Sequence, residues 1–151
     1  MADKNEIVKE LVVAYWMEME TIQNYIANSM NLDGVRAEEI KKALEADVTE
    51  ELGHAQQLAK RIRVLGGSVP RSSAFRACQT FLQPPSDSTD VTSVIKGVIQ
   101  AEDGAIAQYK KIIRLCDADD YVTQDLCITL LSNEEDHRRE FIGFLTEYER
   151  R

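Results

Sequence analysis

The sequence predicts an all-α protein, a four-helix bundle in which one long crossover joins the second helix to the third. Four stretches of the 151-residue chain repeat apolar residues at intervals of three and four, the period of a helix that buries one face. All three prolines fall within residues 66–90, and no stretch alternates apolar and polar residues as a half-buried strand does. We therefore expect a single domain, residues 1–151, made of two helical hairpins joined by this crossover.

The first hairpin consists of the first two helices. The apolar stripe of the first helix runs from Leu11 to Tyr25, and that of the second helix runs from Ile40 to Leu65. Residues 31–34, with the sequence Asn-Leu-Asp-Gly, contain the residues that end helices and form turns. Because the connection is short, we expect the two helices to be antiparallel neighbours.

The crossover, residues 66–90, separates the hairpins. Two glycines stand at its start, and Pro84, Pro85 and three further turn-forming residues stand near its end. A segment of this length can run the whole height of a bundle. Within it, we expect residues 72–82 to form a short extra helix.

The second hairpin follows the same plan. The third stripe runs from Val94 to Cys116 and the fourth from Leu126 to Tyr148. The intervening residues 117–120 include three aspartates, which are favourable caps for the start of a new helix.

Composition excludes several classes of function. Apolar residues make up 44% of the chain, charged residues 29%, and 26 acids against 18 bases leave a net charge of -8. This charge argues against a nucleic-acid partner or an anionic membrane surface. No apolar run is long enough to cross a bilayer, and no signal-peptide pattern is present, so we expect a cytoplasmic protein. The three cysteines include no C-x-x-C pair, which excludes a rubredoxin-type or zinc-ribbon site.

One glutamate interrupts the apolar face of each helix. Glu18 and Glu51 lie almost equally far from Gly34 in the first turn, one on each side of it, and Glu102 and Glu134 lie equally far from Ala118 in the second. The four carboxylates are therefore expected at one height, about 25 Å from the turns at ~1.5 Å per residue. Carboxylates buried without partners cost several kcal/mol each, so something must compensate them.

The only two histidines complete a repeated pattern. His54 follows Glu51 by three residues and His137 follows Glu134 by three, so each pair shares a helix face. Four carboxylates match the charge of two divalent cations, and each cation takes one imidazole nitrogen. Such mixed ligands with open positions suit iron or manganese rather than magnesium or structural zinc. The alternative is a set of buried ion pairs, but no lysines or arginines lie on these stripes to form them.

These motifs, in this order, resemble the ferritin-like superfamily and, within it, the bacterioferritin-type metal site. The resemblance covers nearly the whole chain and includes Glu18 with Tyr25 seven residues later, Glu51-x-x-His54, Glu102, and Asp120-Tyr-Val-x-x-Asp125 leading into Glu134-x-x-His137. It implies that six residues bind two iron ions per subunit, with manganese or zinc able to substitute, and oxidise Fe(II) there. These residues are Glu18, Glu51, His54, Glu102, Glu134 and His137.

Two departures from bacterioferritins modify this expectation. Leu52 occupies the position of the methionine that binds haem in bacterioferritins, so we expect no haem. The segment after His137 is long enough to finish the fourth helix but too short for the fifth helix that bacterioferritins use in their 24-subunit cage. The resemblance then favours the 12-subunit cage of Dps proteins.

A narrower resemblance, to the Dps-like proteins called thioferritins, fits both departures. Those proteins carry one cysteine in the crossover and another at the end of the third helix. Cys78, within Phe75-Arg-Ala-Cys78-Gln-Thr-Phe-Leu-Gln-Pro84, and Cys116 look like that pair, although each is equally explained as a small buried residue. If any disulfide forms, we expect Cys78 with Cys116, because Cys127 should lie about 10 Å away in height, at ~1.5 Å per residue, and belong to the core.

Several other residues lie close to the predicted ligands. Tyr25 and Tyr109 each follow a ligand glutamate by seven residues. We expect ordinary aromatic core residues there, with a hydrogen bond or electron transfer to the site as the alternative. The extra acids Asp47 and Glu50 are expected mostly on a solvated face.

The sequence therefore predicts a ferroxidase that stores iron as a homo-oligomeric cage, using hydrogen peroxide or oxygen as the oxidant. The alternative is a non-storing di-iron or dimanganese peroxidase of the rubrerythrin or manganese-catalase type. A third possibility is an interaction bundle that binds no metal and whose buried charges only set helix register.

Overall fold

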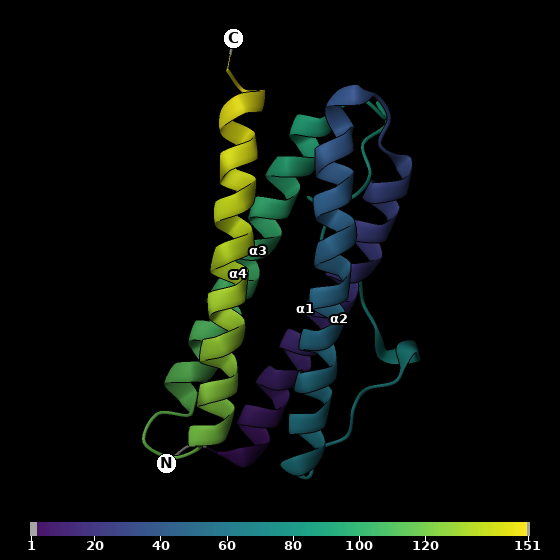
Figure 1. The fold of residues 1–151 in the computed structure, drawn as a ribbon. Helices are drawn as coiled ribbons and strands as arrows, with labels where there is room; N and C mark the ends of the chain where they lie inside the picture. The colour runs from purple at the N-terminus through teal and green to yellow at the C-terminus, as the bar shows by residue number, and fades with distance from the viewer. Residues whose placement is uncertain (1–2, 151) are drawn as a thin grey trace.

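The computed structural model describes residues 3–150 and confirms the predicted all-α bundle with one long crossover (Figure 1). The helices are α1 (Lys4–Asn31), α2 (Glu38–Val64), α3 (Val91–Leu115) and α4 (Tyr121–Tyr148). Two short 3-10 turns, η1 (Val35–Ala37) and η2 (Ser72–Ala74), complete the regular structure, and residues 3–150 contain no strand. The chain end at Arg151, on which the expectation of a 12-subunit cage partly rests, lies outside the described residues.

Aspartate side chains cap three of the four helices. Asp3, Asp90 and Asp120 each accept a hydrogen bond from a backbone N–H in the first turn of α1, α3 and α4. These bonds satisfy donors that have no partner within the helix. The predicted capping role of the aspartates before the fourth helix is thus confirmed at Asp120.

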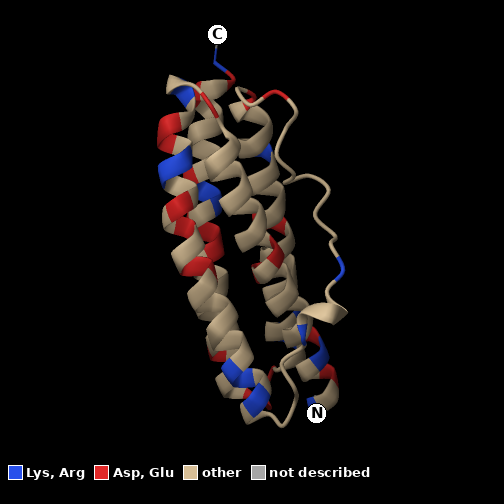
Figure 2. Ribbon diagram, turned by 90° about the vertical axis from the view of Figure 1, so that its right-hand side faces the viewer, with Lys and Arg blue, Asp and Glu red and all other residues tan. Residues whose placement is uncertain are grey.

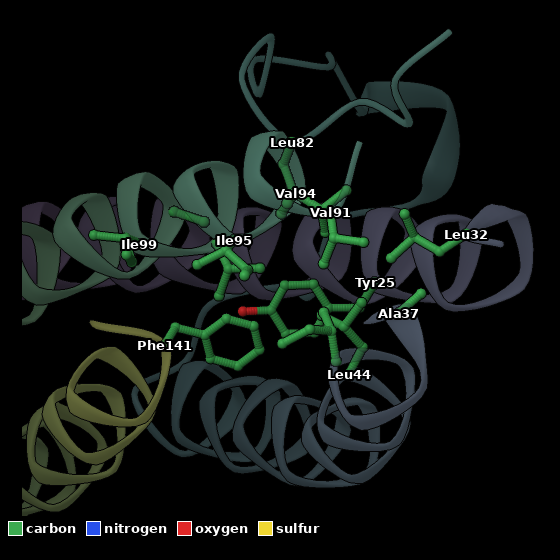
Figure 3. Close-up of a cluster of buried hydrophobic side chains, with 13 residues drawn as sticks. Tyr25, Leu32, Ala37, Leu44, Leu82, Val91, Val94, Ile95, Ile99 and Phe141 are labelled. Carbon is green, nitrogen blue, oxygen red and sulfur yellow. The ribbon is translucent and has the colours of Figure 1, made fainter. Parts of the chain in front are cut away.

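The bundle contains two apolar clusters, one above the other in the view of Figure 1. The upper cluster includes Tyr25, Leu44, Ile95 and Phe141, which meet near the α1–α2 turn, and Figure 3 shows the Tyr25 ring among them. The lower cluster includes Leu11, Leu58, Ile112, Cys127 and Leu130, at the end near the α3–α4 turn. Buried polar side chains lie between the two clusters, and we call them the polar layer. They are Glu18, Glu51, His54, Glu102, Glu134 and His137.

The crossover runs the height of the bundle from the end of α2 to the start of α3 (Figure 1). The prediction of a helix over residues 72–82 is wrong, because only Ser72–Ala74 form a single 3-10 turn. Beyond this turn, the backbone groups of residues 78, 79 and 82 bond to side chains of α1. Glu20 accepts from the N–H groups of Cys78 and Gln79, and Asn28 donates to the carbonyl of Leu82, all at 2.9 Å.

Gly97 allows the crossover to approach α3 closely. A Cβ atom at this position would lie 2.5 Å from the carbonyl oxygen of Phe81 and 3.3 Å from Cα of Leu82. The absence of a side chain at Gly97 therefore lets the fully buried Leu82 join the upper cluster.

Charged residues are distributed along all four helices, and acidic positions occur part-way along them as well as near their ends (Figure 2). Within residues 3–150, no helix combines the length and apolar character that spanning a membrane requires.

Candidate metal centre

The polar layer contains the six predicted ligands, and every helix contributes to it. On α1 and α3 the layer holds Glu18 and Glu102, while α2 and α4 each contribute a Glu-x-x-His pair. All four glutamates are 1–2% exposed. The helical periodicity that places apolar residues in both clusters turns these carboxylates inward as well, because they lie on the same stripes.

His54 faces three of the carboxylates through Nδ1. This atom lies 3.0 Å from Oε1 of Glu134, 3.3 Å from Oε2 of Glu18 and 3.6 Å from Oε2 of Glu51. The other ring nitrogen, Nε2, points away from them and lies 3.2 Å from the side-chain amide of Asn133.

His137 has the corresponding orientation on the other half of the layer. Its Nδ1 lies 3.3 Å from Oε1 of Glu51, and its ring is stacked at 19° to that of His54 with the ring centroids 6.4 Å apart. Its Nε2 points outward, where it contacts Glu50 and lies 3.6 Å from Oδ1 of Asp47.

Two overlapping groups of possible ligand atoms result from this arrangement. Glu18, Glu51, His54 and Glu134 form one, and Glu51, Glu102, Glu134 and His137 form the other, with the atoms of each group within 4.8 Å of one another. Glu51 and Glu134 belong to both groups. The structure therefore brings all six predicted residues together in a pattern of two shared and two unshared carboxylates.

Each of these six residues has one buried polar atom without a hydrogen-bond partner. The six atoms are Oε2 of Glu18, Oε1 of Glu51, Nδ1 of His54, Oε2 of Glu102, Oε1 of Glu134 and Nδ1 of His137. Five of the six face one another only in histidine–carboxylate contacts of 3.0–3.3 Å. Buried polar atoms nearly always have a hydrogen-bond partner, so six without one in a single layer require an explanation. They include oxygen and imidazole nitrogen, the donors that iron and manganese accept. The residues thus fit a pair of divalent ions.

The carboxylates change the proton affinity of both histidines. Burial alone would lower the pKa of His54, but the neighbouring Glu134 and Glu51 outweigh it and raise the pKa to about 10. Burial likewise acts to lower the pKa of His137, and Glu51 and Asp47 raise it to about 10. Without metal, both rings are therefore imidazolium ions near neutral pH, and they partly neutralise the four glutamates.

The pKa values of two of the glutamates shift in opposite directions. Burial, reinforced by the adjacent Glu134, raises the pKa of Glu102 well above its ordinary value. Burial also acts to raise the pKa of Glu51, but the His137 and His54 rings in contact with its carboxylate lower it overall. Such opposed shifts within one buried cluster are typical of functional sites.

Two tyrosines hold the unshared carboxylates. Tyr25 donates to Oε1 of Glu102 at 2.7 Å, and Tyr109 donates to Oε1 of Glu18 at 2.9 Å. Both rings are buried in the apolar clusters, as the sequence favoured. The hydrogen bond to the site that the sequence left as an alternative is also present, because each hydroxyl group donates to a predicted ligand. The bonds cross between α1 and α3, which sequence spacing along one helix does not reveal.

Three residues behind the histidines were not assigned to the site from the sequence. Asn133 is half-buried against His54, while Asp47, only 5% exposed, and the exposed Glu50 face His137. Burial raises the pKa of Asp47 to about 6. The expectation of a solvated face holds for Glu50 and is wrong for Asp47, which lies one turn before Glu51 and so faces the bundle interior.

The structure separates Cys78 from Cys116, so the expected disulfide between them cannot form in this arrangement. Cys78 is exposed and lines a cavity of about 640 Å³ together with Gln100 and Gly104 of α3. Cys116 follows α3 about 18 Å beyond Gly104 at ~1.5 Å per residue, whereas a disulfide needs Cα atoms within about 7 Å. Cys116 instead shares the lower cluster with Cys127, which is buried as expected. Burial raises the pKa of Cys116 to about 11 and that of Cys127 to about 12, so neither is a ready thiolate.

Comparison with known protein families extends these observations to nearly the whole chain. The ferritin-like domain family matches residues 8–151. The chain belongs to the ferritin-like family. This confirms the family resemblance inferred from the glutamate and histidine motifs.

Curated relatives of this ferritin-like chain include two kinds of protein. A DNA protection during starvation protein of Pyrococcus furiosus is 26% identical over 148 residues, covering 95% of this chain and 79% of the relative. A bacterial ferritin of Neisseria meningitidis is 36% identical over 96 residues, covering 62% of this chain and 56% of the relative.

Solved structures with the same fold include a dodecameric thioferritin, the bacterioferritin-related protein of Bacteroides fragilis. It is 24% identical with a TM-score of 0.85, covering 97% of this chain and 88% of that one. The Desulfovibrio desulfuricans bacterioferritin, described with a diiron site, is 22% identical with a TM-score of 0.80, covering 95% and 80%. At these identities the likeness establishes the fold.

Proposed function

We propose that this ferritin-like protein oxidises Fe(II) at a two-metal centre within each subunit and stores the ferric product inside a cage. Two iron ions would bind per chain, with Glu51 and Glu134 bridging them and with Glu18 and Glu102 as terminal ligands. His54 would complete one ion and His137 the other. The observation that carries this proposal is the set of six buried polar atoms without a hydrogen bond, one from each of these residues, which lie in two overlapping groups of possible ligands.

The charges of the layer support divalent iron as the substrate. Four carboxylates carry a formal charge of -4, which two Fe(II) ions balance. Binding the ions displaces the protons of the two imidazolium rings, since a histidine ligates as the neutral base. Two Fe(II) ions supply two electrons, which reduce one hydrogen peroxide with two protons to two waters, or one oxygen with two protons to hydrogen peroxide.

The surrounding residues orient the ligands. The hydroxyl groups of Tyr25 and Tyr109 hold one oxygen of each terminal carboxylate and leave the other directed into the layer. Polar contacts at Nε2 of both histidines direct Nδ1 to the metal side. The two apolar clusters above and below the layer exclude bulk water from it.

The test compares neighbouring acids of α4. Glu134→Gln removes a bridging ligand, while Glu135→Gln removes the same charge from the exposed adjacent residue. We expect Glu134→Gln to slow Fe(II) oxidation at least about 10-fold and to reduce bound iron, and Glu135→Gln to retain both. Ferric absorbance and elemental analysis measure these quantities. Equal activity of Glu134→Gln and the unaltered protein would overturn the proposal.

The proposed cage contains 12 copies, as in the dodecameric relative, and no haem, since the side chain at the exposed Leu52 has no sulfur to bind haem iron. Mass photometry with iron loading tests the assembly. A 12-subunit particle that retains many ferric ions per chain is the expected result. A dimer that turns over peroxide without retaining iron would instead support the peroxidase function of the rubrerythrin or manganese-catalase type.

A further inference from the structure

The two halves of the metal centre match in their ligands but differ in the group behind each histidine. Behind His54 stands the neutral side-chain amide of Asn133, whose Nδ2 lies 3.2 Å from the ring Nε2. Behind His137 stands a carboxylate, that of Glu50, in contact with the ring Nε2. Because the ligands themselves repeat, this difference distinguishes two otherwise equivalent halves.

The positions of the two groups correspond, so only their chemistry differs. Glu50 directly precedes the shared Glu51 on α2, and it reaches the histidine of α4. Asn133 directly precedes the shared Glu134 on α4, and it reaches the histidine of α2. The repeat of the two hairpins therefore places both side chains in the same way, and the chain puts a charged group at one place and a neutral group at the other.

From this difference we infer that Asn133 is a positioning residue that makes the His54 half of the centre the weaker one, so that this half fills last and empties first. The inference rests on the proposed function and concerns the order in which the two halves bind metal. Asn133 acts through the His54 ring, because it contacts Nε2, whereas Nδ1 faces the carboxylates of the layer.

The physical reason lies in the hydrogen bond at the far side of each ring. A histidine that binds metal through Nδ1 carries its hydrogen on Nε2 and donates it to the group behind the ring. A carboxylate accepts this hydrogen as an anion and makes the ring a stronger base toward the metal. The amide accepts it through Oδ1, which a half-turn of the amide brings to the position of Nδ2, and this neutral bond is weaker. The same ion is therefore held less tightly at His54 than at His137.

Unequal halves suit a centre that must pass its product to a store. The ion held by Glu18 and His54 leaves first, because its histidine has the weaker support. The ion held by Glu102 and His137 stays longer and keeps the shared carboxylates in place for the next ion.

Manganese(II) in the absence of oxygen is the probe, because it accepts oxygen and imidazole ligands. The test variant is Asn133→Asp, which replaces the amide by a carboxylate of the same shape, and Asn133→Ala removes the support altogether. The matched control is Ser132→Asp, which adds the same charge at the exposed neighbouring residue. Calorimetric titration of the assembled, metal-free protein gives the two dissociation constants. Anomalous diffraction from crystals with one manganese ion per chain locates the first ion, and thermal melts check that every variant is folded.

We expect the unaltered protein and Ser132→Asp to bind the first ion beside His137 and the second, at least about 10-fold more weakly, beside His54. Asn133→Asp should bind the second ion about 10-fold more tightly and the first unchanged, whereas Asn133→Ala should weaken the second ion further.

Three results would overturn the inference. They are a first ion beside His54, equal affinities for the two ions in the unaltered protein, and a second ion bound equally by the unaltered protein, Asn133→Asp and Asn133→Ala. A gain in Ser132→Asp as large as that in Asn133→Asp would also overturn it, since charge alone would then explain the effect. Absence of manganese from the layer of the unaltered protein would instead overturn the proposed metal centre.

Discussion

Replacement of Gly97 by alanine should detach the crossover from α3. The new Cβ would lie 2.5 Å from the carbonyl oxygen of Phe81, 3.2 Å from Cδ1 of Leu82 and 3.3 Å from Cα of Leu82. Two of these three atoms belong to the backbone, so no side-chain rotation relieves the contact. The crossover must retreat by about 0.5–1 Å to regain ordinary van der Waals distances.

The size of the effect follows from two opposing terms. Overpacking of this kind costs about 1–3 kcal/mol, while alanine gains up to about 1 kcal/mol over glycine inside a helix. Retreat of the crossover also weakens the hydrogen bond from Asn28 to the carbonyl of Leu82. We expect a net destabilisation of about 1–2 kcal/mol, a fall in melting temperature of roughly 2–8 °C for a chain of this size.

Gly104→Ala is the matched control on the same helix. Its added Cβ would meet only Cε of Met17, at 3.4 Å, and this methyl group ends a flexible side chain. We expect this variant to be as stable as the unaltered protein or up to about 1 kcal/mol more stable. Thermal melts of both metal-free variants under one condition decide the matter. Equal stability of Gly97→Ala and Gly104→Ala would contradict the close contact between the crossover and α3 at Gly97.

Two further predictions concern the metal centre. His54 and His137 have pKa values of about 10 in the folded protein against an ordinary 6.5. The stability that their charged forms contribute is therefore complete below about pH 6.5 and is lost as the pH rises toward 10, so the melting temperature of the metal-free protein should fall over this range. The melting temperature of the manganese-loaded protein should fall less, because its imidazoles are already neutral. Thermal melts in which the two proteins show the same dependence of melting temperature on pH would contradict this. Tyr109→Phe removes the donor to Glu18 and should weaken manganese binding by about 10-fold in a chelator competition, as should Tyr25→Phe at Glu102. Tyr15→Phe, whose ring contacts Trp16 instead, is the control, and equal affinities in all three variants would remove the tyrosines from the site.

Periodicity was sufficient to predict the bundle and the six clustered residues, for a definite physical reason. A helix turns one stripe inward, so Glu18 and Glu102 had to be buried if their apolar neighbours were. The nearly equal distances of the four glutamates from the two turns then placed them at one height. The clustering of these residues is a consequence of regular helix geometry.

The crossover and the residues behind the histidines were harder to predict, because their partners are distant in sequence. Nothing in the sequence near Glu20 and Asn28 marks them as partners of the crossover. Each binds it, although the whole of α2 lies between them and the crossover along the chain. Their side chains replace the internal hydrogen bonds that the expected helix over residues 72–82 would have made. Asp47 was placed on a solvated face for the same reason, since nothing local indicates that α4 covers it.

The division of the interior into two apolar clusters separated by a charged layer has a consequence for the cooperativity of unfolding. In most small domains one continuous core makes all elements unfold together. Here a layer of repelling carboxylates separates the upper half of the bundle from the lower half. In the metal-free protein the two halves can therefore unfold as separate units with different amide-exchange rates. Ions bound in the layer would connect all four helices at their midpoints and couple the two halves. The metal content of a subunit would then determine whether it unfolds in one step or two.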